Sequence, residues 1–434
     1  MAVELNTSAK FTETALPQWG AFSYPAFTII WLASLVSNTG NAMFDTSSAW
    51  LMTSLDADPM AVSLVQVATI LPVVLFTLPA GALADVFDSR RLLILAEVAI
   101  VVVIAVFATL VSLNIATPVS LLLTTFALSA GMSLSAPAWL SITPRLVNGP
   151  ELLGAIAANG IGYNVSRAIG PALGGLVIGG FGIAAPIWID FVGCLLMIVA
   201  LLWWRSSPRL IETTPPKRLA DAVLTGLRHT ADNPHLRATM MRSVAFVPFA
   251  SASWTLLPLV ARSQMTQGPA CYGALVSTIG AGAIGGSLVL GWLKAKLGSD
   301  GTVALGTFGA AVALILFGIA HTPIVALCAS ILAGASWAAA LGSLHASAQF
   351  AVPNWVRARG LAVFLTVFFA AMAAGSVLWG RIASFEGVPT AYFAAAAGAI
   401  LALPMTWRWK LMTPGAGELE LGVDIRPATT SQLS

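Results

Sequence analysis

Long apolar stretches separated by short polar ones occupy most of this chain. An α-helix needs roughly 20 apolar residues to cross a hydrocarbon core about 30 Å thick, and the stretches are of about this length or slightly longer. The pattern predicts twelve membrane-spanning helices. They cover residues 26–53, 60–84, 92–113, 118–140, 152–179, 184–204, 240–260, 272–293, 301–320, 323–348, 361–382 and 389–409. The first and fifth are longer than the bilayer is thick, so we expect them to tilt or to extend into the interface.

Composition supports a membrane protein and excludes several other classes. Of the 434 residues, 58% are hydrophobic and 9% are charged, whereas soluble domains average about 25% charged residues. A soluble enzyme, a nucleic-acid-binding protein and a disordered chain are therefore excluded. The three cysteines and four histidines show no metal-ligand spacing. We expect no metal and no bound cofactor.

The polar segments predict both the topology and the domain organisation. If both termini are cytoplasmic, most of the 21 Lys and Arg residues fall on the cytoplasmic side, as the positive-inside rule requires. Residues 205–239 form the only long internal polar segment, and they divide the predicted spans six and six. The expected regions are a cytoplasmic tail, a six-helix bundle, a cytoplasmic linker, a second six-helix bundle and a second tail, at 1–25, 26–204, 205–239, 240–410 and 411–434.

The linker contains apolar residues at helical spacing. Leu219, Val223 and Leu227 recur beside charged residues, which predicts an amphipathic helix on the inner membrane surface. A solvated linker helix without membrane contact is an equally good interpretation.

The two halves also resemble each other, and two motifs point to a family. GALADVFDSRR (81–91) follows the second span, and GWLKAKLG (291–298) follows the eighth. The fifth span carries GPALGG (170–175), and the eleventh carries GSVLWG (375–380). Two parallel halves of six helices are common in secondary transporters.

In these motifs the chain resembles the major facilitator superfamily. The 81–91 run resembles its motif A, although Val86 and Asp88 replace the usual Arg and Gly. GPALGG resembles motif C, which marks exporters and antiporters. The runs 31–55, 78–91 and 351–364 resemble the transmembrane secretion effector group, which includes enterobactin exporters. The resemblance implies an all-α integral membrane fold with twelve helices in two six-helix bundles, located in a bacterial cytoplasmic membrane.

The resemblance implies a cytoplasmic gate at motif A. Its residues here are Gly81, Asp85, Arg90 and Arg91. We expect Asp85 to accept hydrogen bonds from the N-terminus of the eleventh span, where the helix dipole favours negative charge. Arg90 and Arg91 would pair with acids of the inner loops in the outward-facing state. The alternative is that the two arginines only determine topology.

Motif C predicts close helix packing within the fifth span. Gly170, Gly174 and Gly175 present a small-residue face, and Pro171 removes one backbone hydrogen bond. This face either closes the central cavity against leakage or is ordinary small-residue packing.

Ionisable residues inside spans are the strongest functional candidates. A charge near the centre of a membrane helix costs about 2.5 to 3.5 kcal/mol, so it needs a partner or water. Asp45 in the first span and Arg167 in the fifth are expected on neighbouring helices. We predict that they pair and that Asp45 is the proton-linked carboxylate; an inert structural ion pair is the alternative. Glu97 is expected to snorkel or to pair with an inner-loop arginine, and Asp190 is expected at the outer interface.

The first, fourth, seventh and tenth helices are expected to line a central cavity. Asn38 and Asn41 share the helical face of Asp45. The further predicted cavity residues are Trp139, Asn159, Asn164, Trp254, Trp337, His345 and Gln349. Apolar cavities with a few polar and aromatic groups suit amphipathic organic solutes.

These features predict a monomeric, proton-coupled exporter that works by alternating access. Its expected partners are a small-molecule substrate such as a siderophore or drug, protons and the lipid bilayer, and no nucleic acid. A proton-coupled importer is the nearest alternative, and a non-transporting membrane scaffold or sensor is a further one. A membrane-embedded enzyme is not supported, because the chain has neither an HExxH motif nor a GxSxG elbow.

Overall fold

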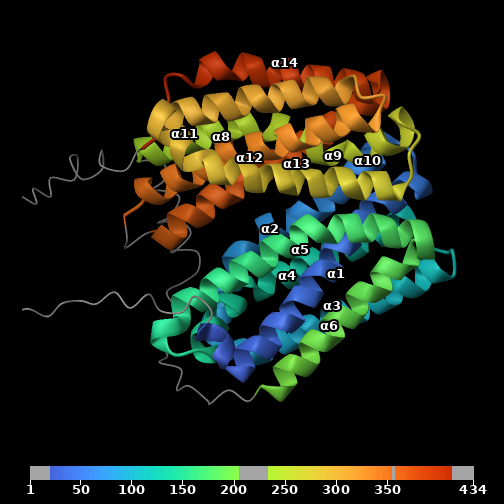
Figure 1. The fold of residues 1–434 in the computed structure, drawn as a ribbon, viewed down its shortest axis with the longest axis vertical. Coiled ribbons are helices and arrows are strands. Elements are labelled where there is room, and N and C mark those ends of the chain that lie inside the picture. The colour runs from blue at the N-terminus through green and yellow to red at the C-terminus, as the bar shows by residue number, and fades with distance from the viewer. Residues whose placement is uncertain (1–19, 205–232, 354–356, 413–434) are drawn as a thin grey trace, which may run out of the picture.

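The computed structural model describes residues 20–204, 233–353 and 357–412, without the side chains of residues 78, 81–86, 358, 359 and 405. Every regular element in these ranges is helical. The helices form two bundles, one from α1 to α6 and one from α8 to α14 (Figure 1). The predicted tails and the linker helix lie outside the described residues.

The first bundle follows the predicted spans closely. Its long helices are α1 (Pro25–Leu55), α2 (Pro59–Val86), α3 (Ser89–Ser112), α4 (Pro118–Leu146), α5 (Leu152–Phe181) and α6 (Ala184–Trp203). Short 3-10 turns, η1 (Gly20–Ser23) and η2 (Gly149–Glu151), precede α1 and α5. Proline begins α1, α2 and α4, where its missing N–H would have no helical acceptor.

The seventh span begins earlier than predicted and is broken. It consists of α8 (Pro234–Ala250), α9 (Ala252–Thr255), α10 (Leu257–Leu259) and a π-helical turn, η3 (Val260–Gln264). Pro248 and Pro258 lie at the interruptions. Each lacks a backbone N–H and clashes with the preceding turn, which explains why one continuous helix does not form.

The predicted eighth and ninth spans are the two arms of α11 (Pro269–Gly318). Gly298 divides them with a φ of 69°, a conformation that glycine adopts without steric cost. Gly273 of the first arm packs against the carbonyl of Pro171, and Gln264, just before α11, donates to the carbonyl of Gly318. Both ends of α11 therefore lie at the same end of the molecule, so its arms run in opposite directions.

The last three spans are α12 (Pro323–Ala351), α13 (Arg357–Glu386) and α14 (Val388–Thr406). Within the described ranges, eight helical segments are long and apolar enough to cross a membrane when α11 is counted once. The second arm of α11, together with α1, α5 and α14, completes the twelve predicted spans.

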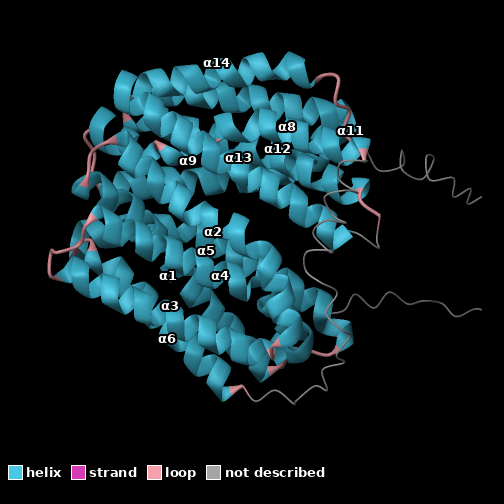
Figure 2. Ribbon diagram, turned by 180° about the vertical axis from the view of Figure 1, so that it is seen from behind, coloured by secondary structure: helices cyan, strands magenta, loops and turns pink. Residues whose placement is uncertain are grey.

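The two bundles are joined at one end and separated at the other. They converge where α1 ends and α11 begins, which we call the closed end, and diverge toward the starts of α1 and α8, which we call the open end (Figures 1 and 2). Arg262 donates to Thr53 and Ser54, and the Met60 N–H donates to Ser384 Oγ over 3.0 Å. The hydrogen bonds between described residues of the two halves all lie at or near the closed end.

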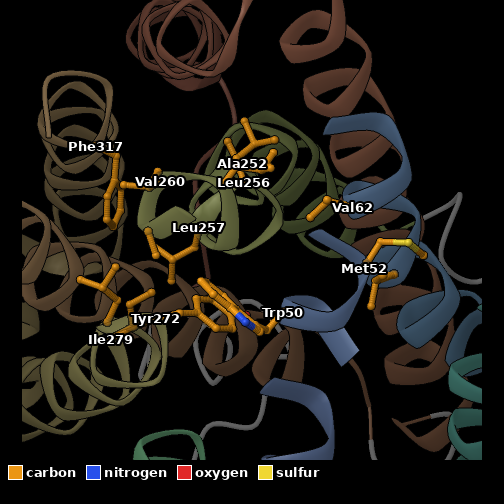
Figure 3. Packing of buried hydrophobic residues seen from close by; sticks show 14 of the residues in the cluster. Trp50, Met52, Val62, Ala252, Leu256, Leu257, Val260, Tyr272, Ile279 and Phe317 are labelled. Atoms are coloured by element: carbon orange, nitrogen blue, oxygen red, sulfur yellow. The ribbon is translucent and has the colours of Figure 1, made fainter. Parts of the chain in front are cut away.

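The largest buried apolar cluster also lies at this junction. Figure 3 shows Trp50 and Val62 of the first bundle beside Leu257 and Tyr272 of the second. The Trp50 and Tyr272 rings stack with centroids 6.1 Å apart. Apolar burial therefore adds to the polar contacts that hold the closed end together.

Candidate functional site

A cavity of about 470 Å³ lies inside the first bundle, between α1, α3, α4, α5 and α6. Small-molecule sites typically enclose about 300 to 1,000 Å³, so a drug-sized ligand fits. The exposed side chains of Leu140 and Tyr163 belong to its lining, which indicates where it opens. Every lining residue comes from the first bundle, whereas the sequence predicted a lining shared by both halves.

Four of the predicted cavity residues line this space: Asn38, Asn41, Trp139 and Asn159. The Asn41 Nδ2 points to Met132 Sδ at 3.6 Å, and the Asn159 Nδ2 donates to Thr143 Oγ1 over 3.2 Å. Asn38 and Asn41 lie on one face of α1, and Asp45 continues that face one turn further on.

Two carboxyl groups that the sequence placed elsewhere also line the cavity. Asp190 was expected at the outer interface, but its side chain is 1% exposed and lies within the first bundle. Glu97 was expected to snorkel or to pair with an arginine; it is 8% exposed and forms no ion pair with a described residue. Helix packing decided both positions, because the hydropathy pattern does not show which face of a helix meets its neighbours.

The contact between α1 and α6 positions Asp190. A Cβ added to Gly40 would lie 2.8 Å from the Asp190 Cα, and one added to Gly193 would lie 3.1 Å from the Ser37 Cα. Cys194, one turn beyond Asp190, points its Sγ to the Asp190 Oδ1 at 3.9 Å. The second carboxylate oxygen, Oδ2, is buried and has no hydrogen-bond partner among the described residues.

Asp45 and Arg167 lie on the packed helices α1 and α5, but they do not form the predicted ion pair in this conformation. No nitrogen of Arg167 lies within 4.0 Å of an Asp45 carboxylate oxygen, although the two charges interact electrostatically. Arg167 instead donates to the Tyr163 hydroxyl over 3.1 Å, and its guanidinium lies 5.7 Å from the centre of that ring. Both charged side chains are exposed.

Tyr163 was not among the predicted site residues, and its spacing from Arg167 is the signal that could have identified it. Residues four apart in a helix are neighbours on its surface. A tyrosine one turn before a membrane-embedded arginine is therefore a local partner that needs no second helix.

The remaining predicted cavity residues lie outside this cavity. Asn164 is exposed and donates to the Gly160 carbonyl within its own helix. The Trp254 and Trp337 rings pack edge to face, with centroids 6.4 Å apart. His345 packs against Phe364 and Phe368, and Gln349 is exposed near the end of α12. The second half thus contributes an aromatic cluster and no side chain to the cavity.

The motif A region makes contacts within the first bundle in this conformation. Arg90 donates to the carbonyls of Leu201 and Leu202, at the C-terminal end of α6, over 2.9 and 3.0 Å. This is a contact with a helix terminus, not the predicted pairing with an acid. Arg91 is exposed. The side chain of Asp85 is not described, and neither are the surroundings of Gly81, so the predicted contact of Asp85 remains a prediction.

Asp88, which departs from the usual motif, has a structural role here. Its carboxylate accepts from the Arg91 N–H at the start of α3 and lies 3.8 Å from Arg145. An Asp at the N-cap satisfies an otherwise free backbone donor.

Motif C packs α5 against both halves at once. A Cβ on Gly170 would lie 2.5 Å from the Ala42 Cβ of α1, whereas one on Gly175 would lie 2.5 Å from the Pro269 carbonyl oxygen of α11. The Ala172 N–H, next to Pro171, donates to Ser277 Oγ of α11 over 2.9 Å. Gly174 faces Met43 of α1. Helices α1, α5 and α11 therefore pack closely at these residues, across the boundary between the halves.

Comparisons with known proteins agree with this architecture. Residues 16–421 match the family model described as transmembrane secretion effector. The chain is 26% identical over 406 residues to the multidrug efflux pump Tap of Mycolicibacterium fortuitum, covering 87% of this chain and 92% of that protein. Among solved structures, the nucleoside transporter NupG matches with a TM-score of 0.70 at 12% identity, over 88% of this chain and 98% of its own.

A second solved structure is also similar in fold. It is a bacterial homologue of the human lysosomal transporter Spinster, in an inward-facing and unoccupied conformation. It matches with a TM-score of 0.69 at 16% identity, over 90% of this chain and 99% of its own.

Proposed function

The chain belongs to the transmembrane secretion effector family of the major facilitator superfamily, and on this basis we propose that it is a proton-coupled exporter of an amphipathic organic molecule. Its family consists of transporters, not enzymes, and the chain is a multi-pass membrane protein that acts on a small-molecule substrate. The proposed substrate is a siderophore or a drug. Similarity to the efflux pump Tap supports export.

The observation that carries the proposal is the environment of Asp45. Its carboxylate is exposed in the membrane-spanning part of α1, with no hydrogen bond or ion pair to a described residue. An intramembrane carboxylate without a fixed partner is costly as an anion. Asp45 is therefore suited to gain and lose a proton, and a movement of α5 that changes its distance to Arg167 would change which form is favoured.

We assign the open end to the cytoplasm and the closed end to the outside. Arg90, Arg145, Arg242 and Lys294 lie toward the open end, which agrees with the positive-inside rule. With this orientation the described conformation is inward-facing. We also propose that the protein lies in a bacterial cytoplasmic membrane with both termini inside. We propose that it acts as a monomer, because each chain contains both halves of the transport path.

In the proposed cycle the two bundles alternate between this conformation and an outward-facing one. The closed-end contacts would break, and the open end would close. Asp85 and Arg90 lie at the open end, where α2 ends and α3 begins. Motif A would therefore help to hold the two bundles together there in the outward-facing conformation, as the family resemblance implies. Motif C would prevent leakage at the closed end.

The test is accumulation of a panel of siderophores, antibiotics and cationic dyes in an efflux-deficient bacterial host. Wild type should lower the accumulation of at least one compound, and an uncoupler should abolish the effect. Asp45→Asn should also abolish it, because the amide cannot carry the proton. Asp56→Asn, an exposed residue just after α1, is the matched control and should behave as wild type.

Other results would replace the proposal. Uncoupler-sensitive export by Asp45→Asn would move the proton site to another residue. Raised accumulation with wild type would indicate an importer. Binding of compounds without any flux would indicate the scaffold or sensor alternative.

A further inference from the structure

We infer that the cavity inside the first bundle is a binding site for an amphipathic organic cation, whose positive charge pairs with Glu97 and Asp190. The inference rests on the proposed function, because it names the class of substrate that the exporter would carry. It concerns the carboxyl groups of α3 and α6 that line the cavity, whereas the proposed proton site is Asp45 of α1, which is not among the lining residues.

The charge of the lining favours a cation. Among the described residues that line it, Glu97 and Asp190 are the only carboxylic acids, and none is Lys, Arg or His. Asp45, one turn from Asn41 on α1, is a third carboxyl group close to the cavity. Arg167 lies outside the lining, and its guanidinium is held on Tyr163. A buried carboxylate without a partner is costly as an anion, and a bound cation offsets that cost. An organic anion offers no such compensation.

Asp190 is the group that most clearly lacks a partner. It is 1% exposed, its Oδ1 has only the Cys194 thiol at 3.9 Å, and its Oδ2 has no partner among the described residues. A buried polar atom without a hydrogen bond destabilises the fold. Because Asp190 lines the cavity, a cationic ligand would satisfy this carboxylate.

Glu97 offers a second carboxyl group from a different helix. It lies on α3, is 8% exposed, and forms no hydrogen bond or ion pair with a described residue. Asp190 lies on α6, which packs against α3. Two acids that approach the same space from two helices define a position for positive charge.

The rest of the lining suits the apolar body of such a ligand. Phe27, Trp31 and Trp139 contribute aromatic rings, whose faces attract cations. The Trp31 ring is held in place, because its Nε1 donates to the Ala158 carbonyl over 2.9 Å. Aliphatic side chains such as Ile100, Leu128 and Ile142 complete the lining.

The test is equilibrium binding of tritiated tetraphenylphosphonium to the purified full-length protein in detergent at neutral pH. We expect saturable binding to wild type. Asp190→Asn and Glu97→Gln should each weaken it about tenfold or more, because each removes one charge from the pair of acids. Asp56→Asn and Glu386→Gln are the matched controls at exposed positions, and they should bind as wild type.

Tetraphenylborate, which has the same shape and the opposite charge, should not compete. Each variant is checked by size-exclusion elution and thermal unfolding. If Asp190→Asn does not fold, Glu97→Gln and Trp139→Leu carry the test, and both should weaken binding.

Three results would overturn the inference: no saturable binding to wild type, unchanged binding in the folded variants, or equal competition by tetraphenylborate. Different results would contradict the proposed function and the proposed cation site. If a neutral or anionic compound is exported in an uncoupler-sensitive manner while tetraphenylphosphonium does not bind, only the cation site is wrong. If tetraphenylphosphonium binds as expected and no compound is exported, only the transport proposal is wrong.

Discussion

The position of an ionisable side chain in this protein depends on which neighbouring group it contacts. Arg167 was expected to pair with Asp45 on another helix, yet it binds Tyr163 one turn away on α5. The local partner is held at a fixed distance by the helix itself, whereas contact with Asp45 depends on how α1 and α5 lie relative to each other. Such a residue can keep one partner while its distance to the other changes during transport.

Arg242 is the contrasting case, since all of its contacts are structural. It is 4% exposed, lies 3.1 Å from Asp300, and donates to the carbonyls of Trp409 and Thr406 over 2.6 and 3.2 Å. It therefore joins α8, α11 and the end of α14.

We predict that Arg242→Gln lowers the free energy of unfolding by about 2 to 3 kcal/mol, because the half-buried Asp300 carboxylate and two backbone carbonyls lose their charged donor. Arg237→Gln is the control: Arg237 is exposed and lies 5.6 Å from the Trp409 ring, so its loss should cost about 1 kcal/mol or less. Unfolding of both variants in mixed micelles by increasing SDS measures the difference. Equal stabilities would contradict the structural role of Arg242.

At the scale of the element, α5 is the helix that connects the two halves most closely. Its glycines meet α1 on one side and α11 on the other. Small residues permit this because the backbones can approach without intervening side chains. A single helix can thus transmit a movement of α11 to α1, which carries Asp45.

We predict that Gly175→Ala destabilises the closed end by about 1 to 3 kcal/mol, the usual cost of overpacking. The added Cβ would lie 2.5 Å from the Pro269 carbonyl oxygen. Gly179→Ala, on the same helix with nothing within 4 Å of the added Cβ, is the control and should leave stability unchanged. Thermal unfolding and efflux are measured for both variants. Equal behaviour of the two variants would show that the α5–α11 contact is not tight in the protein.

At the scale of the whole molecule, the balance between the two conformations depends on contacts confined to one end. The closed end has hydrogen bonds and a shared apolar cluster between the halves. Mutations there should shift the conformational population without unfolding either bundle.

We predict that Arg262→Gln shifts the population toward the outward-facing conformation by about tenfold, because it removes hydrogen bonds from a charged donor to Thr53 and Ser54. Arg381→Gln is the matched control: Arg381 is exposed and stacks on Phe385 of its own helix, 4.3 Å from the ring centre. It should leave the population unchanged.

Electron spin resonance distances across the open end report this shift. Spin labels at Leu153 and Gln349, both exposed near the open ends of α5 and α12, are attached after serine replaces the native cysteines. The distance distribution should move to shorter values in Arg262→Gln and stay as wild type in Arg381→Gln. An unchanged distribution in Arg262→Gln would contradict the role of the closed-end contacts.

Hydropathy and motif spacing were enough to predict the membrane class, the twelve spans and their division into two halves. These follow from local properties: hydropathy sets the length of a span, and glycine and proline act on the backbone where they occur. The face of α1 that carries Asn38 and Asn41 was likewise predictable, because helical spacing fixes which side chains share a face.

Which neighbours each helix face contacts followed from the packing of the helices. The tertiary structure placed Glu97 and Asp190 inside the first bundle, assigned Tyr163 to Arg167, and turned the aromatic residues of the second half away from the cavity. The rotation of each helix about its axis depends on packing against its neighbours, and a uniformly apolar span carries little information about that rotation. The acids of the cavity were visible in the sequence, and their common position was decided by how α3 and α6 pack.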